Sequence, residues 1–119
     1  MPFETRYYFV ASMDVTPEKV DLFNEVYDTE HVPSLMTVPG VISVSRSQKV
    51  EGTLRISGGS VPVGDGEPQF QAIYEIERPD VLRSDAWAAA SEAGRWAEEV
   101  RPFTSNRHHA IRQVILPVV

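Results

Sequence analysis

Along this chain, segments with the residue pattern of a β-strand and segments with the apolar spacing of a helix follow one another in the order strand, helix, strand, strand, helix, strand. The residue types typical of strands, many of them alternating, fill four ranges: 6–13, 41–50, 69–77 and 107–116. Helical spacing begins at Pro17, after a Thr16 cap, and again at Ser84, from which a helix is expected to run to about Val100. The order βαββαβ predicts a four-stranded antiparallel sheet with both helices on one face.

Between the second and third expected strands lies a segment of a different composition. Residues 53–68 are rich in glycine and proline, which favours a loop or an irregular hairpin inserted between two strands. A chain of 119 residues has the ordinary length of one domain. We therefore expect residues 1–119 to form one domain that carries this insertion.

The first expected helix carries an unusual residue on its apolar stripe. Val20, Phe23, Tyr27 and His31 are spaced by three, four and four residues, so they share one helix face. Pro33 disfavours helical geometry at the residue before it, which predicts that the helix ends or kinks near His31. The stripe places an imidazole beside the core aromatics, and we expect the His31 side chain to line a cavity between this helix and the sheet, with Tyr27 one turn earlier on the same side.

The sheet face that the helices leave uncovered is expected to be partly polar. A face of this composition suits a homodimer in which two sheets enclose a partly polar cavity. The alternative is a monomer whose second sheet face is in contact with water, as antiparallel sheets permit.

Charge and composition exclude several classes of partner. The formal charge is −6 and the basic residues are scattered, which argues against nucleic acid. Cysteine is absent, which excludes disulfides and thiol chemistry and fits a reducing cytoplasm. No signal-peptide pattern and no apolar run of membrane-spanning length is present, so we expect a cytoplasmic protein that does not enter a membrane.

The sequence Tyr27-Asp28-Thr29-Glu30-His31-Val32-Pro33, followed by Val38-Pro39-Gly40-Val41, resembles the dimeric α+β barrel superfamily of ferredoxin-like proteins. Within it, the chain is similar to EthD-like and related small proteins of bacterial catabolic and polyketide pathways. The resemblance implies a ferredoxin-like α+β fold, a homodimer and a pocket for a small hydrophobic or aromatic molecule. Haem-binding relatives generally use a histidine of the second helix, and residues 84–100 contain none. We therefore expect no cofactor.

His31 is the main catalytic candidate. An imidazole has a reference pKa of about 6.5 and serves as a general acid or base near neutral pH. A helix C-terminus and the nearby acids Asp28 and Glu30 are expected to raise this pKa. The alternative is a structural histidine that donates a hydrogen bond to a carbonyl at the end of the helix.

Five further residues are weighed as site residues. Tyr27 is a second catalytic candidate, because its hydroxyl can orient a substrate oxygen, although a core role is the alternative. Glu30 is expected either on the solvated helix surface or beside His31. Three residues are candidates for substrate binding together with Glu30: Arg46, Glu75 and Trp87.

The other two histidines do not suggest a metal site. His108 and His109 are adjacent on the last expected strand, so their side chains point to opposite faces and cannot chelate one ion. We expect no metal.

The sequence predicts a cofactor-free enzyme that uses His31 for acid/base chemistry on a small, largely apolar substrate such as an aromatic, a lactone or a polyketide intermediate. The reaction types considered are those of an isomerase, cyclase, lyase or monooxygenase. The alternative is a non-catalytic homodimer that binds a hydrophobic ligand or responds to stress. The motif does not decide between them.

Overall fold

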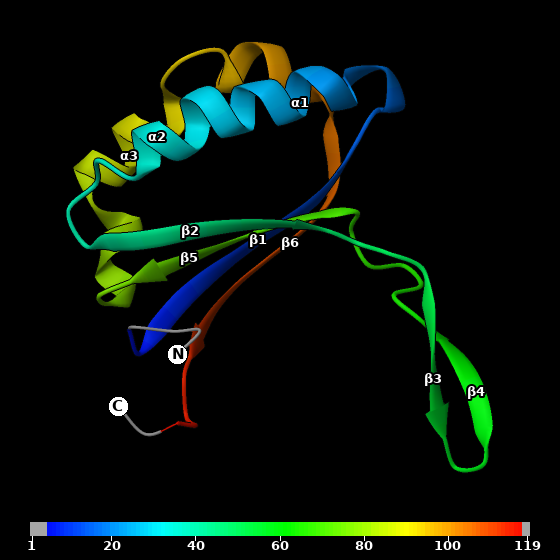
Figure 1. Cartoon of the computed structure of the whole chain (residues 1–119). Coiled ribbons are helices and arrows are strands. Elements are labelled where there is room, and N and C mark those ends of the chain that lie inside the picture. Colours follow the sequence, from blue (N-terminus) through cyan, green and yellow to red (C-terminus); the bar gives the residue numbers. More distant parts are fainter. Residues whose placement is uncertain (1–4, 118–119) are drawn as a thin grey trace.

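The computed structural model describes residues 5–117 and shows a curved four-stranded sheet beneath a layer of helices (Figure 1). Four strands form this sheet: β1 (Tyr7–Val15), β2 (Val41–Gln48), β5 (Phe70–Ile76) and β6 (Thr104–Gln113). Their spatial order is β2-β5-β1-β6, and every neighbouring pair is antiparallel. The predicted four-stranded antiparallel sheet is confirmed.

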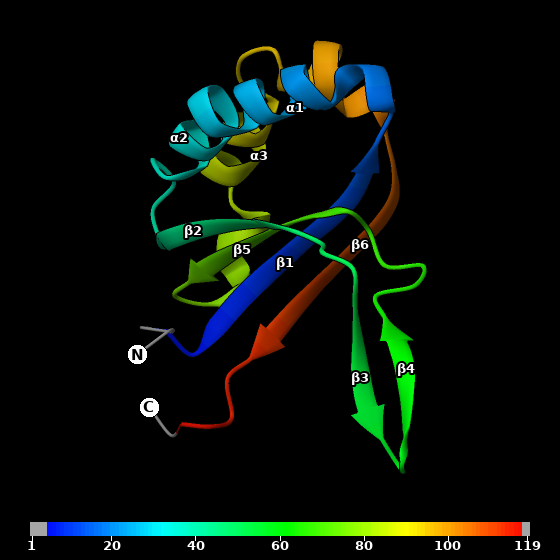
Figure 2. The ribbon, with the colours of Figure 1, turned by 45° about the vertical axis from the view of Figure 1, so that its right-hand side comes forward.

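The helices α1 (Val20–Val26), α2 (Val32–Leu35) and α3 (Asp85–Glu92) all lie on one face of the sheet (Figures 1 and 2). A short 3₁₀ turn, Pro17–Lys19, precedes α1. This arrangement is the α+β ferredoxin-like fold that the element order predicts. Every helix in residues 5–117 is too short or too polar to cross a membrane.

The first helix does not end at His31. It widens there into one π-helical turn, Tyr27–His31, in which the amide of Val32 donates to the carbonyl of Tyr27, and it continues to Leu35. Proline in a regular helix clashes with the carbonyl four residues earlier. The wider π turn changes the local backbone at this point, so the helix accommodates Pro33.

The second helical region is broken, although continuous helix was predicted over 84–100. α3 starts at a proper cap, where the Ser84 hydroxyl accepts a hydrogen bond from the amide of Trp87 at 3.1 Å. It ends before Gly94, whose φ of +71° is incompatible with a right-handed helix. A Cβ at Gly94 would also lie 2.6 Å from a Glu30 carboxylate oxygen. The chain resumes as a second π turn, Trp96–Val100.

The insertion forms a two-stranded hairpin, β3 (Gly52–Ile56) and β4 (Gly59–Val63), as one of the two predicted forms. It projects away from the helices, beyond the sheet (Figures 1 and 2). Ser57 and Gly58 both have positive φ, as the tight turn between the strands requires. One face of the hairpin is apolar and 41–54% exposed, made of Leu54, Ile56, Val61 and Val63.

The sheet separates two environments. Side chains such as Ala11, Ala72 and Tyr74 point toward the helices and are at most 7% exposed. Alternate residues, including Val10 and Ile73, point to the opposite face, which no helix of the described chain covers (Figure 1).

Candidate functional site

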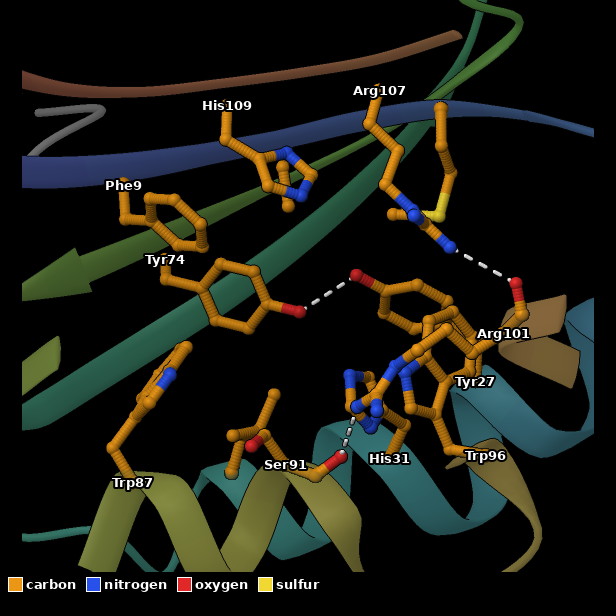
Figure 3. A pocket seen from close by; sticks show the side chains of 13 residues that line it. Phe9, Tyr27, His31, Tyr74, Trp87, Ser91, Trp96, Arg101, Arg107 and His109 are labelled. Atoms are coloured by element: carbon orange, nitrogen blue, oxygen red, sulfur yellow. Dashed lines mark hydrogen bonds between the residues drawn. The ribbon is translucent and has the colours of Figure 1, made fainter. Parts of the chain in front are cut away.

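A pocket of about 330 Å³ lies between the helices and the sheet within one chain (Figure 3). Its wall is mainly aromatic, formed by Phe9, Tyr27, Tyr74, Trp87 and Trp96. β1 and β5 supply Phe9 and Tyr74, while the helical segments supply the other three. The pocket is formed within one chain, between the first helix and the sheet, where the His31 side chain was expected. It is distinct from the cavity between paired sheets that was also expected.

The π turns place His31 and Trp96 face to face. Their rings are stacked at a centroid distance of 4.2 Å and an interplanar angle of 18°. The Tyr27 ring meets the imidazole edge-on at 5.0 Å. His31 is 6% exposed and lines the pocket with Tyr27, one turn earlier on the same helix face. The helical spacing therefore predicted the position of both side chains.

Nδ1 of His31 is buried and has no hydrogen-bond partner among residues 5–117. The structural alternative required this histidine to satisfy a carbonyl at a helix end, but Nδ1 makes no such bond. An unsatisfied buried polar atom costs about 1–3 kcal/mol. Such an atom in a native structure calls for an explanation, and a functional role is one of those commonly found.

The electrostatic environment keeps His31 neutral. Burial, and to a lesser degree the positive charge of Arg101, lowers the pKa of His31 from 6.5 to about 4. The helix end and the nearby acids were expected to raise this pKa, and that prediction was wrong. The chain continues as helix beyond His31, so no helix C-terminus stabilises the cation. Glu30 is paired with Arg95 instead.

Two tyrosine hydroxyls meet inside the pocket. The Tyr27 and Tyr74 oxygens lie 2.7 Å apart, which is a hydrogen bond (Figure 3). Burial raises the pKa of Tyr27 to about 12 and also raises the pKa of Tyr74. Both hydroxyls therefore stay protonated at neutral pH. One proton is used within the pair, so the pair retains one proton to donate to a ligand oxygen.

Trp87 occupies the other end of the aromatic wall. Its ring packs edge-on against Phe9 at 5.9 Å and against Tyr74 at 5.5 Å. The cap that Ser84 provides at the start of α3 holds the backbone of this residue. Of the predicted substrate-binding residues, Trp87 is the one that lines the pocket.

The other three predicted substrate-binding residues lie elsewhere. Arg46 stacks on the Tyr27 ring at 4.5 Å and donates hydrogen bonds to Asn24 and Asp28. It reinforces the pocket wall from outside. Glu30 accepts two hydrogen bonds from Arg95, from its backbone amide and from its side chain, and these lower the pKa of Glu30.

Glu75 is buried on the opposite face of the sheet. It alternates with Tyr74 along β5, so it points away from the helices, and it accepts a hydrogen bond from the Ser43 hydroxyl. The substrate-binding roles of Arg46, Glu30 and Glu75 remain predictions, at positions outside the pocket.

Sequence reasoning missed several residues that line the pocket. Tyr74 and Trp96 were recognised only as core residues, although a buried hydroxyl needs a partner. A basic group at the pocket comes from the end of the chain: Arg101, Arg107 and His109. Arg107 and His109 are two residues apart on β6, so strand alternation places them on one face, and this signal was available.

Nothing in the described residues forms a metal site. Residues 5–117 contain no group of three or more His, Asp or Glu side chains arranged to hold an ion. His108 and His109 pair with Ser12 and Ala11 of β1, respectively, so they point to opposite faces of the sheet, as predicted.

No family model matches the chain, and no curated protein matches its sequence. Solved structures do match its fold. An EthD family protein from Bacillus halodurans shares 16% identity at a TM-score of 0.61, over 92% of this chain and 99% of that one. A dimeric ferredoxin-like protein of unknown function from Thermobifida fusca shares 13% identity at a TM-score of 0.55, over 94% of each chain.

The haem degrader MhuD from Mycobacterium tuberculosis, with two haems bound in its active site, is also similar. It shares 14% identity at a TM-score of 0.55, over 95% of this chain and 99% of that one. At these identities the likeness establishes the fold. The chain has a ferredoxin-like α+β fold similar to that of the EthD family protein, as the resemblance implied.

Proposed function

We propose that this protein is a cofactor-independent enzyme that transfers a proton on a small aromatic or enolisable substrate, as an isomerase or cyclase does. The observation that carries the proposal is the state of His31. Its imidazole is neutral, lies buried on the pocket wall, and has no partner for Nδ1 within the described part of the chain. A neutral imidazole has a lone pair with which to accept a proton.

The surroundings of His31 supply the second half of such a reaction. The Tyr27–Tyr74 pair has one spare hydroxyl proton, which can donate to a carbonyl or enolate oxygen as negative charge develops there. Stabilising the enolate makes the neighbouring C–H more acidic. This matters because a base with a pKa of about 4 removes only a readily released proton. Aromatic ketones, lactones and polyketide intermediates are substrates of this kind.

The same residues argue for chemistry without haem. The haem degrader MhuD shows that this fold can hold porphyrins. Here the helical segments 85–92 and 96–100, where haem-binding relatives generally carry the axial ligand, contain no histidine. The second helical region therefore supplies no histidine for haem, and we assign His31 to proton transfer in a cytoplasmic enzyme.

The uncovered sheet face supports the homodimer as part of the proposal. It combines Val10 and Ile73 with polar neighbours, and no helix of the described chain covers it. Light scattering is expected to report twice the monomer mass at micromolar concentration. Replacing Ile73→Asp on this face is expected to give a folded monomer, because a buried unpaired carboxylate opposes association. A wild-type protein that is monomeric throughout contradicts the assembly.

Keto–enol conversion of phenylpyruvate tests the proposed chemistry. This probe is an aromatic 2-oxo acid whose tautomers differ in ultraviolet absorption, and the reaction needs only proton transfer. Its neutral methyl ester is measured beside it, so that charge recognition does not decide the outcome. We expect the purified protein to accelerate the reaction without any added cofactor, and His31→Ala to lower kcat/KM by about 10²-fold or more.

His31→Gln is the matched control, because glutamine keeps hydrogen-bonding capacity but does not transfer protons near neutral pH. It should be as inactive as His31→Ala while its melting temperature stays closer to that of the wild type. No acceleration with either probe, or full activity in a folded His31→Gln variant, contradicts the proposal. Either result favours the non-catalytic ligand-binding homodimer.

A further inference from the structure

The charged residues on the pocket wall all have one sign. Arg101 and Arg107 line the pocket together with His109, while none of its described lining residues is Asp or Glu. The chain as a whole has a formal charge of −6. The pocket therefore has the opposite charge to the rest of the molecule, and cationic groups beside an apolar wall attract anions.

Only one of the two guanidinium groups is neutralised. Nη1 of Arg101 donates to both carboxylate oxygens of Glu92 at 2.9 Å. Arg107 forms no salt bridge within residues 5–117. Its Nη2 donates to the Arg101 carbonyl oxygen at 3.0 Å and to the Thr104 hydroxyl (Figure 3 shows the first bond). These two bonds hold the guanidinium of Arg107 in place. Neither bond uses the N–H donors on Nε and Nη1.

Arg107 and His109 mark the mouth of the pocket. Both are exposed residues of β6, the edge strand, and they lie on its helix-facing side. His109 meets the Phe9 ring edge-on at 5.6 Å, so the basic rim continues directly into the aromatic wall. A ligand that enters with its ring first leaves its polar end beside Arg107.

We infer that the pocket takes an aromatic monoanion, whose carboxylate accepts hydrogen bonds from Arg107 while its ring lies against the aromatic wall. One uncompensated guanidinium matches one negative charge, and its planar donors match a carboxylate. The inference names the substrate class for the proposed function and rests on the same pocket. It assigns Arg107 to specificity and not to proton transfer.

Tryptophan fluorescence tests this directly, because both tryptophans of the chain, Trp87 and Trp96, line the pocket. The probes are 4-nitrobenzoate and 4-nitrobenzamide, which have nearly the same shape, differ in charge and quench tryptophan emission. In the wild type we expect the anion to bind about tenfold more tightly than the amide, since hydrogen bonds to charged groups are the stronger kind. The equilibrium constants are obtained by titration with correction for probe absorption.

Arg107→Gln should lose the preference for the anion and bind the two probes equally. Arg55→Gln is the control, because Arg55 lies on the β3–β4 hairpin and does not line the pocket, and it should keep the wild-type preference. If Arg107→Gln does not fold, the salt dependence of wild-type binding replaces it: added salt should weaken binding of the anion and not of the amide.

Equal binding of both probes by the wild type, or a folded Arg107→Gln variant that still prefers the anion, overturns the inference. So does binding of the anion that is insensitive to salt. The assay measures binding without turnover, so its failure leaves proton transfer at His31 to be judged on the neutral ester. A catalytically inert protein that prefers the anion fails the proposed function and keeps this inference.

Discussion

The aromatic pocket and the β3–β4 hairpin are both rich in apolar side chains, but they differ in what those side chains contact. In the pocket, Tyr27 and Trp96 are 2% and 4% exposed because helices and sheet enclose them. In the hairpin, Leu54 and Ile56 are 51% and 54% exposed because a two-stranded unit has no second layer. Apolar composition alone does not produce burial. Packing of one layer against another does.

The two regions also differ in how firmly their side chains are held in position. His31 is fixed between Trp96 and Tyr27, and its acid/base behaviour follows from that enclosure. An isolated two-stranded hairpin is marginally stable in water, so its conformation depends on its connections to the sheet. We therefore place the chemistry in the pocket and expect substitutions there to have the larger effects.

Removing the Trp96 ring should have the largest effect on stability. Trp96→Ala leaves a cavity beside His31, Tyr27 and Phe23, and such truncations cost about 3–5 kcal/mol of unfolding free energy. The matched change in the hairpin, Leu54→Ala, should stay within about 0.5 kcal/mol, as for most surface substitutions. Urea denaturation measures both. Equal losses would erase the contrast between the two regions.

Acid should destabilise the pocket through His31. Its pKa is about 4 in the folded protein and about 6.5 when unfolded, so the unfolded chain binds the extra proton first as pH falls. Neutral His31 thus contributes about 3 kcal/mol to the free energy of unfolding above pH 6.5, and this contribution is lost as pH falls from 6.5 to 4.

His31→Gln isolates that contribution, because carboxylates titrate in both proteins. As pH is lowered through this window, the melting temperature of the wild type should fall relative to that of His31→Gln. A difference that does not change with pH would mean that His31 is not enclosed as described.

The tyrosine pair should show a smaller and non-additive effect. Tyr27→Phe leaves the buried Tyr74 hydroxyl without its partner, at a cost of about 1–3 kcal/mol. Replacing both tyrosines by phenylalanine removes both polar groups, so the double variant should be more stable than the sum of the single changes indicates. A double-mutant cycle by urea denaturation measures the coupling, and strict additivity would contradict the hydrogen bond.

Shortening the hairpin should have the smallest effect on the pocket. Replacing residues 52–63 with a short glycine–serine linker removes no pocket-lining residue. The tryptophan emission spectrum and the affinity for 4-nitrobenzoate should therefore match those of the full chain. A loss of affinity would show that the hairpin supports the pocket after all.

Local patterns were sufficient to predict the framework of the fold. The alternation of Phe70, Ala72 and Tyr74 fixed the buried face of β5, and the spacing of Phe23, Tyr27 and His31 fixed the inner face of the first helix. These patterns follow from burial against one neighbouring layer, which the chain encodes locally. The hairpin was one of the two forms predicted from glycine and proline content.

Features that depend on distant residues were not predicted. The break at Gly94 was missed because Trp96 and Val100 continue the apolar spacing on its far side. The pKa of His31 depends on burial against Trp96 and on the charge of Arg101, 65 and 70 residues away along the chain. Arg107 and His109 were missed because β6 lacks an apolar alternation that would reveal which face they share.

The pH dependence of kcat/KM for phenylpyruvate tests the central claim, that neutral His31 is the base in this pocket. Such a profile reports the pKa of the essential base in the free enzyme. Because the pKa of His31 is about 4, the wild-type profile should be flat from about pH 6 to 8 and fall only below about pH 5. A profile that falls near pH 6.5, the range of an exposed histidine, or one that is the same in His31→Gln, would contradict the account.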